Sequence, residues 1–249
     1  MSRLWISILT LFIYALAQFG VAILQATGAY GDLQGQDLAI AGIYTQVTLF
    51  IIAAILIILL HLFTKNPTQL EQQPKEEKRY IVLWAIVGYI AVMIYQIIAN
   101  MINIYIFHLP QESENTTQLM EIAQQIPIFI VLISIVGPIL EEYVFRKVIF
   151  GELYNVIKGN RVVAFIIATT VSSLIFGLAH GDPTHMLIYF GMGVIFSGFY
   201  VLTKRLWVSI LIHMFQNGFV VIMQFALGPD KIKELQDQVD FIPVSYTHL

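Results

Sequence analysis

Two glutamates and an arginine stand inside an apolar stretch, in the segment ILEEYVFRKVIFG at residues 139–151. On a helix, Glu142 and Arg146 are four residues apart and share a face, whereas Glu141 lies about 140° from Arg146 and points elsewhere. A charge in the middle of a spanning helix costs about 2.5 to 3.5 kcal/mol, so something must offset its presence. We therefore expect Glu142 and Arg146 to neutralise one another and Glu141 to face a different partner.

The same segment has an alternative placement at the membrane interface, where each charged side chain would snorkel to water. The apolar pattern continues past the charges through VIFGELY, which favours a helix that runs on to about residue 153 with Glu141 near its middle. The two placements differ in whether the charged side chains are buried.

Two other apolar segments carry residues that could act with Glu141. His180 follows Phe176 by one helical turn in SSLIFGLAHGD, and His213 and Asn217 share one helix face in LIHMFQNGF. A single intramembrane histidine is often only a hydrogen-bonded structural residue. Three segments that each offer a polar group of this kind indicate a site.

The chemistry of that site has two forms. Glu141, His180 and His213 are the ligand types of His2Glu zinc hydrolases, although the H-E-x-x-H signature is absent. Without a metal, a carboxylate helped by one histidine could deprotonate water, while the second histidine and an asparagine amide stabilise the oxyanion. A zinc cofactor and a metal-free scheme both stay open at this point.

The composition places these residues in a membrane protein. Hydrophobic residues make up 58 % of the 249 residues and charged residues 12 %, whereas soluble domains average about 45 to 50 % and about 25 %. With a net charge of -3 and no basic block, nothing in the sequence indicates a nucleic-acid partner, and the absence of cysteine excludes disulfides and thiolate chemistry. The expected partners are the lipid bilayer and a membrane-associated peptide or protein.

Apolar stretches long enough to span a bilayer predict about seven helices in an all-α, polytopic bundle. They fall at 4–24, 38–63, 80–107, 127–153, 162–181, 183–203 and 206–228. With the N-terminus in the cytoplasm, only Lys231 and Lys233 lie on the outer side, which fits the positive-inside rule. The basic residues then assigned to the cytoplasmic side are Arg3, Lys65, Lys75, Lys78, Arg79, Arg146, Lys147, Lys158, Arg161, Lys204 and Arg205.

The polar, proline-broken stretch 64–79 is the clearest linker. It divides the chain into leading helices with their cytoplasmic linker (1–79), a functional core (80–228) and a polar tail (229–249). The closing PVSYTHL resembles translated sequencing-adapter sequence.

Further polar and small residues carry weaker expectations. Asp182 and His185 should be solvated in a short turn, and the topology places His180 about 10 Å nearer the outer face than Glu141 at about 1.5 Å per residue. Gln96, Asn100 and Asn103 form a stripe suited to interhelical hydrogen bonds, Pro138 should kink its helix, and Gly191 and Gly193 should permit close helix approach.

The motifs, taken together, resemble a known family. Glu141-Glu142-Tyr143-Val144-Phe145-Arg146 looks like E-E-x-x-x-R, Phe176 to His180 like F-x-x-x-H, and His213 to Asn217 like the Asn form of H-x-x-x-N/D. In this order they are the motifs of the CPBP (Abi) family of intramembrane proteases, the CAAX-protease and bacteriocin-processing group with its Rce1-like enzymes.

The resemblance implies a bundle of about eight helices with an intramembrane catalytic cavity, in a multi-pass protein of a bacterial plasma membrane. It implies an endopeptidase that cleaves membrane-associated or lipidated peptides, by CAAX-type or leader-peptide processing. Glu141 with His180 would activate water, and His213 with Asn217 would stabilise the oxyanion. Glu142, Arg146 and Phe176 would support them.

Two other classes of function compete with the protease. Relatives of this kind also act as non-catalytic bacteriocin self-immunity or peptide-binding membrane proteins. Intramembrane Glu and His residues also build the proton relays of carriers, although the chain shows no internal repeat of the kind that carriers use.

Overall fold

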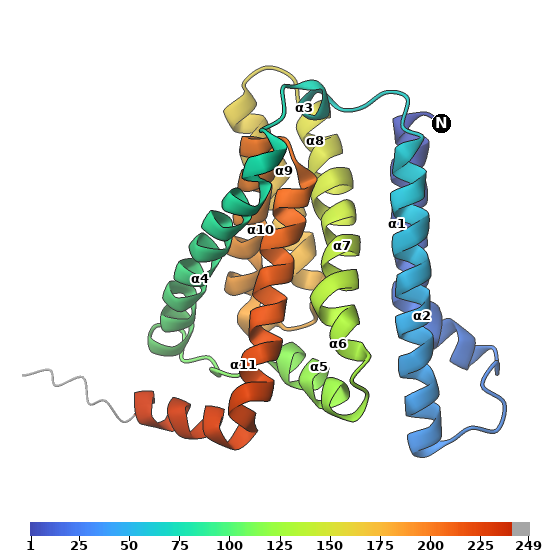
Figure 1. The fold of residues 1–249 in the computed structure, drawn as a ribbon, viewed down its shortest axis with the longest axis vertical. Helices are drawn as coiled ribbons and strands as arrows, with labels where there is room; N and C mark the ends of the chain where they lie inside the picture. The colour runs from blue at the N-terminus through green and yellow to red at the C-terminus, as the bar shows by residue number, and fades with distance from the viewer. Residues whose placement is uncertain (241–249) are drawn as a thin grey trace, which may run out of the picture.

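The computed structural model describes residues 1–240 of the chain, with side chains described as far as Leu227. All the regular structure within this range is helical, and the long helices run side by side (Figure 1). The predicted all-α fold is therefore confirmed for these residues. The PVSYTHL sequence at 243–249 lies outside the described residues.

Six segments in the described part of the chain are long and apolar enough to cross a membrane. They coincide with six of the seven predicted spans, and they make the chain a multi-pass membrane protein. Their helices are α1 (Arg3–Ala26), α2 (Gly35–Leu62), α4 (Ile81–Tyr105), α9 (Arg161–Ala179), α10 (Met186–Thr203) and α11 (Leu206–Asp240).

The seventh predicted span, which carries the glutamates, is helical but irregular. It consists of α6 (Phe129–Val131), the π-helical η2 (Leu132–Val136), α7 (Gly137–Glu141), the π-helical η3 (Glu142–Phe150) and α8 (Gly151–Val156). Pro138 stands at the start of α7, where its missing N–H interrupts the regular hydrogen-bond ladder. A side chain from α9 helps to satisfy the irregular backbone, because the Ser172 hydroxyl donates to the Phe145 carbonyl over 2.7 Å.

Short helices occupy the connections. They are α3 (Gln69–Gln72), η1 (Lys78–Tyr80), α5 (Glu114–Gln125) and η4 (Pro183–His185). The sequence analysis missed α5, because 12 residues with a mainly polar composition carry no membrane signal. Ser113 caps its first turn, and Met120 and Ala123 are buried on one face. The helix lies across the end of the bundle, beside α6 (Figure 1).

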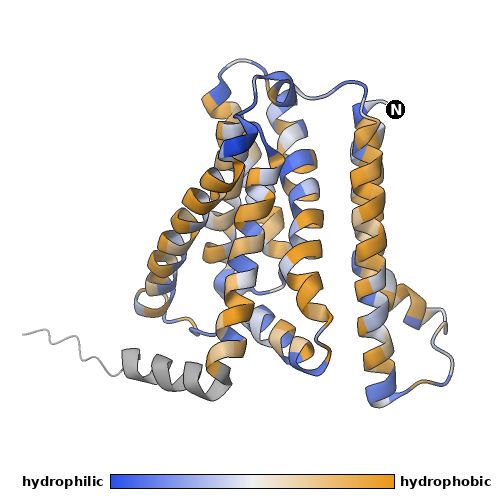
Figure 2. Cartoon of the chain, viewed as in Figure 1, coloured by the Kyte–Doolittle hydropathy of each residue, from blue (hydrophilic) through white to orange (hydrophobic). Residues whose placement is uncertain are grey.

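Most residues of the long helices are hydrophobic (Figure 2), and many of their large apolar side chains are exposed, as a lipid environment requires. On α1, for example, Trp5, Phe12 and Phe19 are each exposed to about 60 %, with fractions of 61 %, 58 % and 63 %. Hydrophilic residues gather instead at the ends of the bundle and along the connection from α2 to α4.

Close helix contacts depend on the two predicted glycines of α10. A Cβ atom at Gly191 would collide with the Tyr95 ring on α4, and one at Gly193 would collide with Ser173 on α9. The prediction that these glycines permit close approach is confirmed. Because α10 packs tightly between α4 and α9, its residues Tyr189 and Met192 are fixed in the lining of the cavity described below.

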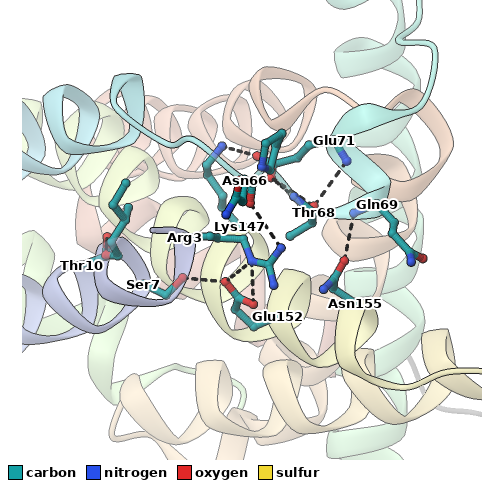
Figure 3. A network of polar contacts seen from close by, with 12 residues as sticks. Arg3, Ser7, Thr10, Asn66, Thr68, Gln69, Glu71, Lys147, Glu152 and Asn155 are labelled. Carbon is teal, nitrogen blue, oxygen red and sulfur yellow. Dashed lines mark hydrogen bonds and ion pairs between the residues drawn. The ribbon is translucent and has the colours of Figure 1, made fainter. Parts of the chain in front are cut away.

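A polar network ties the leading helices to the rest of the bundle (Figure 3). Arg3 pairs with Glu152 of α8 over 2.9 Å, and the Ser7 hydroxyl donates to the same carboxylate over 2.7 Å. In the linker, Glu71 accepts a hydrogen bond from the Lys147 ammonium of η3. The network therefore fastens both α1 and the 64–79 linker to the irregular segment that carries the glutamates.

The charge of Glu71 is set by its partners. Burial would raise the pKa of its carboxyl, but the Lys147 ammonium and the hydrogen bonds from Thr68 outweigh burial and hold the pKa below its ordinary value of 4.5. The carboxylate therefore adds stability that is fully present above about pH 4.5, and that is lost as the pH falls through the lowered folded-state pKa.

We predict that Glu71→Gln lowers the stability of the detergent-purified protein by about 1 to 3 kcal/mol, because it leaves a partly buried ammonium without its charged partner. Thermal unfolding at pH 7 measures this loss, and the difference from wild type should shrink as the pH falls below about 4.5. Glu77→Gln is the matched control, since that linker carboxylate pairs with Arg79 at an exposed site. Equal unfolding temperatures for the two variants would contradict the role of Glu71.

Candidate active site

The charged pair predicted on one helix face is completely buried. Glu142 and Arg146 both have 0 % exposed side chains, and Glu142 Oε1 lies 3.2 Å from Arg146 Nη1. Aromatic rings enclose the guanidinium, whose central carbon lies 4.1 Å from the centre of Phe176 and 4.9 Å from that of Phe196. The predicted pairing is confirmed, and the interfacial alternative is wrong for these two residues.

The position of Arg146 also differs from the prediction. The positive-inside argument placed it among the basic residues of the cytoplasmic side, but it lies in the interior of the bundle. Its guanidinium fits there because the carboxylate four residues earlier balances its charge, while the faces of two phenylalanines contact its planar surface.

His213 of α11 joins this pair. Its Nδ1 lies 3.0 Å from Glu142 Oε1, and its ring stacks on Phe196 with the centres 4.9 Å apart. Because a carboxylate accepts hydrogen bonds, Nδ1 carries the hydrogen, and the ring orientation is fixed. The other nitrogen, Nε2, faces Glu141 at 3.7 Å from Oε2, which is too long for a hydrogen bond.

Glu141 is placed differently from its neighbour. Its side chain keeps 21 % exposure, and its close charged contact is with His213 on another helix, as the face argument predicted. Its Oε2 has no hydrogen-bond partner among the described residues. One turn earlier, Gly137 lies beside the carboxylate, and a Cβ there would be in ordinary contact with Glu141 Oε1 at 3.8 Å. Glu141 is thus a carboxylate free to bind something else.

His180 caps the C-terminal end of α9. Its Nδ1 is 2.8 Å from the Phe176 carbonyl oxygen, and a carbonyl can only accept, so Nδ1 carries a hydrogen. The ring lies between the edge of Phe176 and the face of Tyr189, with centres 4.6 Å and 4.1 Å away. In the neutral ring, Nε2 therefore holds a lone pair and can accept a proton.

Asn217 lies one turn beyond His213 on α11. Its side-chain amide donates over 3.0 Å to the Ile133 carbonyl, inside the π-helical run η2. An asparagine amide has two N–H groups, so one remains for another acceptor. The irregular backbone of η2 therefore orients this side chain as well.

These four residues line one cavity of about 290 Å³. The turn after α9 contacts the N-terminal end of α5, because Ser113 donates to Asp182 and Asn115 reaches Tyr189, and the cavity extends from Glu141 to His180. Carboxamides make up much of the remaining polar lining: Gln18, Gln46, Gln96, Asn115 and Gln216. The cavity lining contains no Lys or Arg.

Sequence reasoning missed several wall residues. Tyr14 and Phe50 come from the leading helices, which carried no motif, and only contact with η3 and α7 brings them to the cavity. Gln216 stands between His213 and Asn217 in the sequence, so its spacing from His213 could have indicated it. Gln96 of the predicted stripe also lines the cavity, and Asn103 donates between helices to the Thr184 carbonyl.

The suggested zinc ligands do not form a preorganised metal-binding group: within residues 1–227, no three His, Asp or Glu side chains are arranged to hold a metal ion. Of the proposed ligands Glu141, His180 and His213, the last keeps its Nε2 3.7 Å from Glu141 Oε2 and has Nδ1 engaged by Glu142.

The turn between α9 and α10 also corrects a prediction. Asp182 and His185, expected to be solvated, are buried with 2 % and 3 % exposure. Burial would raise the pKa of Asp182, but hydrogen bonds from Thr184 and Ser113 and the neighbouring His185 hold that pKa below its ordinary value. The carboxylate therefore stays ionised at neutral pH.

Comparisons with known proteins agree with these motifs. A family model described as Type II CAAX prenyl endopeptidase Rce1-like matches residues 123–219, which contain Glu141, His180, His213 and Asn217. The chain is 56 % identical over 242 residues to the membrane-embedded CAAX protease MroQ of Staphylococcus aureus (strain USA300), which covers 97 % of this chain and 98 % of that protein. It is 37 % identical over 244 residues to the putative membrane peptidase YdiL of Bacillus subtilis (strain 168), with 96 % of each chain covered. No solved structure matches the chain.

The two adjacent glutamates should differ in their effect on stability. Glu142→Gln leaves the enclosed Arg146 without its counter-charge, and we predict a loss of about 3 to 5 kcal/mol, as for other broken buried pairs. Glu141→Gln should change stability by less than about 1 kcal/mol, because Glu141 Oε2 has no hydrogen bond to lose. Thermal unfolding of the two purified variants compares them directly, and equal destabilisation would contradict the separate roles.

Proposed function

Because the chain belongs to the Rce1-like CAAX prenyl endopeptidase family of peptidases, we propose that it cleaves peptide bonds of membrane-associated peptides or proteins within the cavity between η3, α9 and α11. One observation supports this proposal above all: the side chains of four residues line the same cavity between the membrane-spanning helices. They are Glu141, His180, His213 and Asn217. Six spans and the helical segment 129–156 then form a seven-segment bundle around an intramembrane catalytic cavity.

The first step is activation of a water molecule. Glu141 has an oxygen without a hydrogen-bond partner in the described structure, and His180 offers the lone pair of Nε2. A water molecule between them would lose one proton to Glu141 while its oxygen bonds to the scissile carbonyl carbon. The carbonyl π electrons move to the oxygen, which becomes an oxyanion.

His213 and Asn217 are placed to bind that oxyanion. Asn217 keeps one free N–H, and protonated His213 would donate from Nε2 while Nδ1 stays on Glu142. A positive charge on His213 would also offset the negative charge that develops on the oxyanion. When the oxyanion collapses, the C–N bond breaks, and the proton held by Glu141 passes to the leaving amine.

Glu142, Arg146 and Phe176 support this arrangement without touching the substrate. Glu142 accepts from His213 and pairs with Arg146, whose guanidinium is held against the Phe176 ring. Phe176 also accepts from His180 through its carbonyl. The buried charge pair thus orients His213, while Phe176 contacts both Arg146 and His180.

The cavity lining bears on the substrate. Side-chain amides can pair with the N–H and C=O groups of an extended peptide, which would otherwise be unsatisfied within a membrane. The lining has no Lys or Arg to hold a terminal carboxylate, which favours cleavage at an internal bond. We therefore propose an endopeptidase for an uncharged stretch of a membrane-associated peptide, by CAAX-type or leader-peptide processing.

The charged end of the bundle supports the proposed orientation. Arg3, Lys147 and the 64–79 linker meet at the same end, where the polar network of Figure 3 lies. The positive-inside rule supports a cytoplasmic position for this end in a bacterial plasma membrane.

We predict that the wild-type protein in detergent cleaves members of a pool of membrane-associated peptides, read as new termini by mass spectrometry. Glu141→Gln, His180→Ala and His213→Ala should each lower the rate by at least about 100-fold, because each removes a proton carrier or oxyanion donor. Glu121→Gln, which changes an exposed carboxylate on α5, is the control and should cleave normally. A chelator should leave the rate unchanged.

Two outcomes would overturn this assignment. Cleavage by Glu141→Gln at the wild-type rate would exclude Glu141 as the base, and loss of cleavage with the chelator would require a metal. If wild type cleaves nothing, while wild type and Glu141→Gln bind the same peptide equally, the protein is a peptide-binding or self-immunity protein.

A further inference from the structure

The turn between α9 and α10 contains a buried polar cluster that the proposed reaction does not use. The Asp182 carboxylate accepts from Thr184 Oγ1 and from Ser113 Oγ, each over 2.7 Å. His185 lies beside it, with Nδ1 3.2 Å from Asp182 Oδ1 and Nε2 3.3 Å from the Gln111 carbonyl. Both ring nitrogens thus face oxygen atoms. Ser113 links the cluster to Tyr189, because it contacts both Asp182 and the Tyr189 hydroxyl.

Ser113 connects this cluster to the site. Its hydroxyl hydrogen goes to the Asp182 carboxylate, so its oxygen is an acceptor toward the Tyr189 hydroxyl, which lies 3.1 Å away. Asn115 reaches the same Tyr189 oxygen over 3.4 Å. The hydrogen bonds therefore run in one direction, from Tyr189 to Ser113 to Asp182, and they hold the end of the Tyr189 ring.

Tyr189 in turn is stacked on His180. The two ring centres are 4.1 Å apart and their planes differ by 23°, so one face of the imidazole is covered. The Phe176 edge and carbonyl hold the ring from the helix that carries it. The tyrosine is 8 % exposed and lines the cavity, which leaves the imidazole little freedom to turn away from Glu141.

We infer that Tyr189 is a positioning residue for His180, held in place by Asp182 through Ser113. The inference rests on the proposed function, in which His180 shares the activation of water with Glu141. The buried turn thus helps to keep the His180 imidazole aligned. Through Ser113 it also connects the N-terminus of α5 to the site. Ser113 and Asn115 precede the segment matched by the family model, whereas Asp182 and Tyr189 lie within it, so the support joins residues from inside and outside that segment.

Four variants measured by steady-state cleavage test the inference. Tyr189→Phe keeps the stacked ring but loses the hydroxyl tie, so kcat should fall about 5- to 10-fold with KM within twofold of wild type, the loss of about one hydrogen bond. Tyr189→Leu loses the ring as well, and kcat should fall at least about 50-fold. Asp182→Asn and Ser113→Ala interrupt the chain at its end and middle and should resemble Tyr189→Phe. Tyr105→Phe, at an exposed tyrosine of α4, is the control.

The combination of variants separates positioning from stability. If the residues act as one chain, Asp182→Asn with Tyr189→Phe should be no slower than the slower single variant, whereas independent effects would multiply. All rates are measured on monodisperse protein whose unfolding temperature has been recorded. If Asp182→Asn does not fold, Ser113→Ala replaces it in the double variant.

The outcomes are distinguishable from failure of the proposed function. A wild-type protein that cleaves no peptide removes the proposed function and this inference with it. A wild type that cleaves, with Tyr189→Leu matching its kcat, leaves the protease in place and overturns the positioning role. A raised KM at unchanged kcat, or multiplying effects in the double variant, would overturn it too.

Discussion

The buried pair between Glu142 and Arg146 is the constraint on which the site depends. Each charge is costly inside a bundle that lipid surrounds, and each is tolerable only because the other is 3.2 Å away. The pair leaves Glu142 able to accept from His213, which fixes that imidazole, and it places Arg146 against the Phe176 ring. Removing Glu142 therefore removes the hydrogen bond that orients His213.

The same segment departs from regular helical geometry on both sides of Glu141. Two π-helical runs flank Glu141, and each offers a backbone carbonyl to a side chain of another helix: Ile133 to Asn217 and Phe145 to Ser172. Such irregular turns are costly in a membrane unless neighbouring side chains satisfy them. Hydrogen bonds to the π-helical runs thus connect α9 and α11 to the segment that carries the glutamates. These contacts keep the polar side chains of the three segments around one cavity.

Much of this arrangement could be predicted from the residues. The spacing of Glu142 and Arg146 indicated their pairing, and hydropathy gave the six spans. Spacing could not show that the turn holding Asp182 and His185 is buried, because a mainly polar α5 covers it and leaves no hydrophobic signal. Nor could it show that Tyr14 and Gln46 line the cavity, since that depends on how α1 and α2 pack against a distant segment.

The central claim is that one buried charge pair supports both the fold and the catalytic geometry, and the double variant Glu142→Leu with Arg146→Met tests it most directly. Replacing both charges by apolar groups of similar size should recover much of the stability that either single change loses. The double variant should not cleave peptides, because His213 has lost the Glu142 carboxylate that orients it. Recovery of stability without activity is the predicted result. A double variant that cleaves at the wild-type rate would contradict the account, since the histidines would then be aligned without the pair.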